Sequence, residues 1–160
     1  MSIPSGTYTF ESVQFPGVYL RMDGNGVTKS VGPGGGIVNC QFGTGPYEKF
    51  KLDCVDSCNY TIESVQFPGV YLRLDGSGVT ESVGPGGGVV NCQFGAGPYE
   101  KFKLVYVGAD YSFNVQSVQF PGVYLRMDGK GVAAFAGPGG GVVNCQFGPG
   151  PYEKFKLKSA

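Results

Sequence analysis

Short segments in which apolar and polar residues alternate follow one another along the chain. In VYLRMD (18–23), the apolar residues Val18, Leu20 and Met22 alternate with polar ones. A strand with this period of two buries one face and exposes the other. No segment sustains the 3.6-residue period of an amphipathic helix, so the pattern predicts an all-β chain.

The first third of the chain predicts four such strands. In the third of them, Val38, Cys40 and Phe42 share the face that we expect to be buried. The segments between the strands are rich in glycine and proline, as turns are. The expected strands are 8–15, 18–23, 37–42 and 47–52.

This block of four strands occurs three times, roughly 50 residues apart. GPGGGIVNCQFGTGPYEKFKL (32–52) returns with few changes at 84–104 and 137–157. An isolated block could not bury its apolar face, whereas three blocks closed around an axis could, without exposed sheet edges.

About twelve short strands in three equivalent blocks predict a β-trefoil with pseudo-threefold symmetry. We expect one domain, 1–160. Its repeats are expected at 8–59, 60–110 and 111–160. The alternative is a threefold β-prism, but the Gln-x-Asp-x-Asn-x-Val-x-Tyr motif of monocot-lectin prisms is matched only in its middle, by DGNGV (23–27).

Charge and composition narrow the classes of partner. Twelve basic and twelve acidic residues cancel, which argues against nucleic acid or an anionic membrane. No apolar run approaches the roughly 20 residues that span a bilayer, so we expect no membrane insertion. MSIPSGTYTF has neither the basic nor the apolar region of a signal peptide, so we expect a cytoplasmic protein, with release without a leader left open.

The sequence lacks several residues that catalytic and metal-binding sites commonly use. The chain has no histidine, so Ser-His-Asp, Cys-His and His-bearing zinc sites are excluded, and we expect no enzyme. GPGGG lacks the lysine of a phosphate-binding loop, and DGNGV places Val27 where a calcium loop needs an oxygen ligand. No cofactor and no metal are expected.

The five cysteines divide into two groups. Cys40, Cys92 and Cys145 are equivalent in the three repeats and share the buried face, so we expect them in the core. Cys54 and Cys58 occur only in the link after the first repeat. Their CVDSC spacing could close a small disulfide loop, but in a cytoplasmic protein two free thiols are expected.

Four polar positions in each repeat are candidates for ligand binding. The aspartate ends the second strand and could accept a sugar hydroxyl, or only stabilise its turn. The asparagine could bind a ligand or tie down a loop. The tyrosine could stack on a sugar or pack beneath its turn. The glutamate could accept hydroxyls or pair with lysine at the surface. The candidates are Asp23, Asn39, Tyr47 and Glu48, then Asp75, Asn91, Tyr99 and Glu100, then Asp128, Asn144, Tyr152 and Glu153.

The third repeat departs from the other two. VTKSV and VTESV become VAAFA (132–136), which places Phe135 where Ser30 and Ser82 stand. If this loop lines a pocket, the third site differs from the others. The alternative is a contact between protomers, so a homodimer stays open. Arg21 and its equivalents Arg73 and Arg126 could bind a carboxylate or pair with a nearby acid.

Two stretches resemble known families. VNCQFGTGPYEKFKL, after the YLRMDG hairpin, resembles the repeat of fascin-like and hisactophilin-like β-trefoils, in which a GkYL hairpin precedes a GPWExF corner. Tyr47, Tyr99 and Tyr152 occupy the position of that tryptophan. MSIPSGTYTF resembles the start of cytoplasmic fungal β-trefoil lectins, although the ricin-type Gln-x-Trp motif is absent. The resemblance implies a β-trefoil over nearly the whole chain.

FESVQFPGVYLR is also similar to the SxNYPGYYLRH element of arabinofuranose-binding β-trefoil modules. Met22, Leu74 and Met127 stand at the histidine of that element. The resemblances imply sugar binding or actin bundling. We expect a multivalent carbohydrate-binding protein whose partners are glycans or glycoconjugates. An actin-bundling or other protein-interaction module of the fascin type, a protease inhibitor and a purely structural protein remain as alternatives.

Overall fold

The computed structural model describes residues 3–160, and the described part of the chain contains twelve β-strands and three single-turn 3-10 helices. No helix among these residues is long and apolar enough to cross a membrane. The strands are β1 (Gly6–Ser12), β2 (Val18–Asp23), β3 (Ile37–Phe42), β4 (Phe50–Asp56), β5 (Asn59–Ser64), β6 (Val70–Asp75), β7 (Val89–Phe94), β8 (Phe102–Val107), β9 (Ser112–Ser117), β10 (Val123–Asp128), β11 (Val142–Phe147) and β12 (Phe155–Ser159). The 3-10 helices are η1 (Pro46–Glu48), η2 (Pro98–Glu100) and η3 (Pro151–Glu153).

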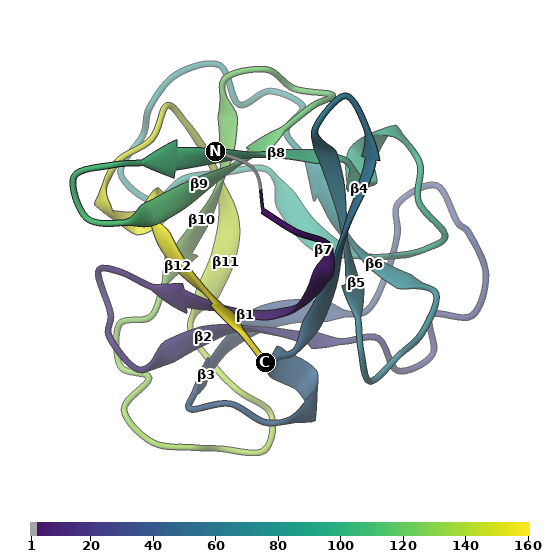
Figure 1. The fold of residues 1–160 in the computed structure, drawn as a ribbon, viewed down its shortest axis with the longest axis horizontal. Helices are drawn as coiled ribbons and strands as arrows, with labels where there is room; N and C mark the ends of the chain where they lie inside the picture. The colour runs from purple at the N-terminus through teal and green to yellow at the C-terminus, as the bar shows by residue number, and fades with distance from the viewer. Residues whose placement is uncertain (1–2) are drawn as a thin grey trace.

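Six strands close into a barrel, and the other six form three hairpins around it. The barrel runs through antiparallel pairs from β1 to β4, β5, β8, β9 and β12, and β12 pairs with β1 again. The hairpins are β2–β3, β6–β7 and β10–β11, one in each repeat (Figure 1). This closed arrangement is the predicted β-trefoil.

The core lies on the barrel axis and beneath the hairpins. Phe10 is fully buried and contacts the rings of Phe50 and Phe155 edge-on, with centroids 5.8 and 6.5 Å away. Burying each such ring stabilises the fold by about 1.5–3 kcal/mol. The core prediction for Leu20 and Met22 is confirmed, and so is that for the repeated cysteines. Those cysteines are Cys40, Cys92 and Cys145.

Three local predictions about the strands are wrong. The strand expected at 8–15 ends at Ser12. Phe42 was expected in the core but is 38% exposed. It ends β3 at the edge of the hairpin, and its Cε1 lies 2.8 Å from where a Cβ would stand at Gly17. The strand expected at 47–52 begins at Phe50, because Glu48 Oε1 accepts a hydrogen bond of 2.6 Å from the Gly45 N–H and holds the preceding residues in η1.

The GPGGG segments (32–36, 84–88 and 137–141), which we call the glycine straps, connect neighbouring repeats. Gly35 exchanges two backbone hydrogen bonds with Cys92 of the second repeat, at 2.9 and 2.7 Å. Gly34 has a φ of +70°, and a Cβ there would lie 2.6 Å from the Cys92 carbonyl oxygen. Only glycine combines this conformation with so close an approach. The other straps bridge to Cys145 and Cys40 in the same way.

Candidate functional site

Each junction between repeats forms a pocket with the same plan. A glycine strap covers one side, the end of a hairpin strand supplies an arginine and an aspartate, and a 3-10 helix supplies a tyrosine and a glutamate. We name the pockets after their arginines: the Arg73 pocket, the Arg126 pocket and the Arg21 pocket. Their volumes are about 680, 650 and 410 Å³.

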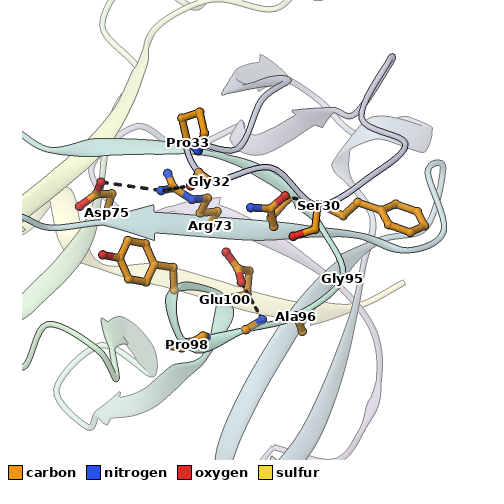
Figure 2. A pocket seen from close by; sticks show the side chains of 13 residues that line it. Ser30, Gly32, Pro33, Arg73, Asp75, Gly95, Ala96, Pro98 and Glu100 are labelled. Carbon is orange, nitrogen blue, oxygen red and sulfur yellow. Dashed lines mark hydrogen bonds and ion pairs between the residues drawn. The ribbon is translucent and has the colours of Figure 1, made fainter.

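The arginine forms the centre of each pocket. Arg73 lies between the strap residues Gly32 and Pro33 and the side of the pocket that holds Glu100 (Figure 2). Its Nη1 donates to Asn91 Oδ1 at 3.3 Å, and its Nη2 donates to the Gly32 carbonyl at 3.1 Å. Although the residue is only 5% exposed, its Nε makes no hydrogen bond within residues 3–160. Two of the five N–H groups thus hold the guanidinium in place, and the others, including Nε–H, are left to donate to a ligand.

The aspartate stabilises its own turn with one carboxylate oxygen and presents the other to the pocket. Asp75 Oδ1 accepts from the backbone N–H and the hydroxyl of Ser77, at 3.0 and 2.6 Å. These two hydrogen bonds lower the pKa of Asp75. Its Oδ2 lies 3.7 Å from Arg73 Nη2 and is still able to accept a hydrogen bond. The geometry therefore fits both interpretations of this aspartate, as a turn-stabilising residue and as an acceptor for a sugar hydroxyl.

The tyrosine and the glutamate come from the 3-10 helix. Tyr99 packs edge-on against Phe120 at 5.2 Å, and the Arg73 guanidinium lies 5.0 Å from the centre of its ring. The ring thus packs beneath its turn, as one interpretation held, while the half-buried residue still lines the pocket.

The surface ion pair with lysine that the sequence suggested for the glutamate is wrong. Glu100 is 3% exposed, and its Oε1 accepts from the Gly97 N–H at 2.7 Å. Burial raises the pKa of Glu100, while the Gly97 hydrogen bond and the Arg73 charge oppose that rise. Glu100 also lines the pocket. The tertiary structure buries it because η2 folds its side chain back over its own turn.

The asparagines lie beside the pockets and do not line them. Asn91 Oδ1 accepts from Arg73, and its Nδ2 donates to the Pro33 carbonyl at 3.0 Å. Asn39 and Asn144 make the equivalent contacts. Both ends of each amide are thus occupied in tying the arginine to the neighbouring strap, which is the loop-anchoring role that the sequence left open.

Sequence reasoning missed the glutamine two positions further along the same strand. Gln93 lines the Arg73 pocket and accepts the Val31 N–H of the preceding repeat at 3.0 Å. Alternation with the buried Val90 and Cys92 predicts an exposed side chain at this position, but Gln93 is buried. Because it shares a strand face with the candidate Asn91, the sequence could have marked Gln93 as a candidate as well. The sequence alone could not show that the loop of another repeat lies against it.

The charges of the pocket indicate the kind of ligand that it suits. Each pocket combines one arginine with two carboxyl groups, so it is not a cationic site for an anion. The arginine offers a donor, the aspartate an acceptor, and the tyrosine a ring with a polar tip. This set suits a neutral ligand that carries many hydroxyl groups. The Arg126 pocket differs in one respect, because Lys130 adds a second positively charged side chain to its lining.

The structure is similar to several solved β-trefoils. The sequence matches no protein-family model and no curated protein. A Rhizoctonia solani agglutinin is 18% identical, with a TM-score of 0.70, over 100% of this chain and 99% of that one. SeviL bound to asialo-GM1 saccharide is 14% identical, with a TM-score of 0.68, over 98% and 99%. A mosquitocidal holotoxin is 10% identical, with a TM-score of 0.76, over 99% of this chain but 18% of its own. The chain is therefore a β-trefoil protein whose structural neighbours are mostly lectins.

Proposed function

We propose that this protein binds carbohydrates through its three junction pockets. The observation that carries the proposal is the repeated pairing, in one pocket, of an immobilised arginine donor with an aspartate acceptor beside a tyrosine ring. A sugar hydroxyl donates and accepts at once, and a sugar ring has an apolar C–H face. The lectins among the structural neighbours support the same class of ligand.

The threefold arrangement supports multivalent binding as part of this proposal. Shallow pockets hold single sugar units weakly, but engagement of several pockets by one glycoconjugate raises the apparent affinity by orders of magnitude. The three pockets lie around one axis on a closed barrel, so their spacing is rigid. A surface that displays many copies of one sugar is thus the partner that this geometry fits.

The test is a glycan array on the purified protein, without calcium. The variant replaces Asp23, Asp75 and Asp128 with asparagine. Asparagine keeps the Oδ1 that holds the turn but replaces Oδ2 with an amide donor, so the fold should survive. Losing a hydrogen bond to a charged group costs about 1.5–3 kcal/mol per pocket, or roughly a tenfold to hundredfold weaker affinity.

The matched control is Asp53→Asn, which makes the same chemical change on exposed β4, outside the pockets. It should bind as the wild type does. A blank array for the wild-type protein, or equal binding by the triple variant, would remove the basis of the proposal. A blank array together with co-sedimentation with filamentous actin would favour the actin-bundling alternative instead.

A further inference from the structure

The Arg21 pocket has a phenylalanine on its strap side, Phe135, whereas the phenylalanines that line the other two pockets, Phe94 and Phe147, come from the hairpin side. Phe135 precedes the strap of the third repeat, where the equivalent residues are Ser30 and Ser82. Its Cε2 lies 4.0 Å from the position that a Cβ would take at Gly45. The ring therefore extends from the strap toward the turn before η1. This pocket has a volume of about 410 Å³, against 680 and 650 Å³ for the other two.

The position of Phe135 is not explained by the folding of the chain. The side chain is 63% exposed, so it buries little apolar surface. Residues of its loop that are polar in the other repeats are alanine here, at Ala133 and Ala134. The loop is thus apolar beside this pocket, and of its changed residues Phe135 is the one that lines it, in place of the Ser30 and Ser82 hydroxyls of the other two pockets.

The polar groups of the Arg21 pocket retain unused hydrogen-bonding capacity. Arg21 Nε makes no hydrogen bond within residues 3–160, and its nearest acid is Glu48 Oε2 at 3.9 Å. Asp23 Oδ2 lies 4.0 Å from Arg21 Nη2. The pocket thus offers a donor, a carboxylate acceptor and, unlike its two equivalents, an apolar ring from the strap side.

We propose that the Arg21 pocket is selective for sugar units that carry an acetamido group, an inference that rests on the proposed carbohydrate binding. An acetamido group has an N–H donor, a carbonyl acceptor and a methyl group. The N–H matches the Asp23 carboxylate, the carbonyl matches Arg21 Nε, and the methyl group matches the Phe135 ring. At the other pockets a serine hydroxyl stands at the strap-side position of Phe135, and the lining phenylalanine, Phe94 or Phe147, lies on the hairpin side, so an acetamido group that contacts the aspartate and the arginine there meets a hydroxyl on the strap side.

The experiment follows each pocket separately by NMR. The backbone amides of Gly45, Gly97 and Gly150 each donate to the glutamate of one pocket, so each reports on one pocket. Four sugars serve as probes: N-acetylglucosamine and N-acetylgalactosamine, with glucose and galactose as the partners that lack the acetamido group.

For at least one of the two pairs, we expect the acetamido sugar to bind the Arg21 pocket about fivefold more tightly than its parent, since one buried methyl group accounts for roughly that factor. The Gly97 and Gly150 signals should show no such preference.

Two reciprocal variants decide the role of the ring. Phe135→Ser should abolish the preference at the Gly45 signal, and Ser82→Phe should create it at the Gly150 signal. Both positions are exposed, so both variants should melt near the wild-type temperature. Equal preference in all three pockets, or a preference that survives Phe135→Ser, would overturn the inference.

Two further outcomes are distinguishable. If the parent and acetamido sugars bind only the Arg73 and Arg126 pockets, Phe135 blocks its pocket, and this inference fails while carbohydrate binding stands. If no sugar shifts any of the three signals, the proposed function fails as well. A Gly45 signal that shifts with protein concentration alone would assign Phe135 to a contact between protomers and would also overturn the inference.

Discussion

The glycine straps predict that one added methyl group will both destabilise the fold and impair one pocket. In Gly34→Ala, the backbone must hold alanine at a φ of +70°, which costs roughly 1–2 kcal/mol. The new Cβ would also lie 2.6 Å from the Cys92 carbonyl oxygen and 2.7 Å from Arg73 Cδ, so strap and strand must separate. We expect a total loss of about 2–4 kcal/mol of unfolding free energy.

Thermal unfolding followed by circular dichroism measures this loss. For a chain of this length, about 2–4 kcal/mol corresponds to a fall in melting temperature of about 6–12 °C. Because the aliphatic part of the Arg73 side chain must move, the affinity for sugar at the Arg73 pocket should fall. The affinities of the Arg21 and Arg126 pockets should be unchanged. The Gly97 amide signal reports on that pocket.

The matched control is Gly32→Ala, in the same strap. Its Cβ would meet nothing within 4 Å, and its φ lies outside the left-handed region. We expect a change of less than about 0.5 kcal/mol. The equivalent substitutions Gly86→Ala and Gly139→Ala should repeat the loss seen for Gly34, because their surroundings are the same. A Gly34→Ala protein that melts within about 2 °C of the wild type would refute the role assigned to the strap.

Two further predictions concern ionisable groups. Burial raises the pKa of Glu48 above its ordinary 4.5, against the opposing effects of the Gly45 hydrogen bond and the Arg21 charge. Its contribution to stability is therefore fully present below pH 4.5 and is lost as the pH rises through the raised value. Denaturant unfolding at several pH values should show this loss as a fall in the free energy of unfolding, and the fall should be smaller in Glu48→Gln. The same dependence on pH in the wild type and the variant would contradict the assignment. Cys54 and Cys58 are exposed, whereas the other three cysteines are buried with pKa values of about 12. A thiol reagent should thus modify two cysteines in the folded protein and all five after unfolding, and rapid reaction of a third in the folded state would argue against the buried positions.

The architecture was accessible from the sequence because its signals are local or repeated. Alternation with a period of two identified the strands and placed Leu20, Met22 and Cys40 in the core. The repetition of one block showed that three units must share a core, since one unit has too little apolar surface to fold alone. The β-trefoil follows from these two features, and the structure confirms it.

The candidate site was accessible only in part. The sequence selected Asp75, Tyr99 and Glu100, all of which line one pocket. It also selected Asn91, whose amide oxygen accepts from Arg73 and whose amide nitrogen donates to the Pro33 carbonyl, and which does not line the pocket. It described the glutamate as a surface residue, because nothing in the order of residues shows that a 3-10 turn will fold the side chain inward.

The sequence by itself thus determined the strands, their grouping into three repeats and most of the core, because each depends on spacing along the chain. Only the tertiary structure decided where the pockets lie. Each pocket is built from the strap of one repeat and the hairpin of the next, as when Gly32 accepts the Arg73 hydrogen bond. For the same reason Phe135 of the third repeat lines the same pocket as Arg21 of the first. Closure of the barrel brings these residues together, and no local pattern records that contact.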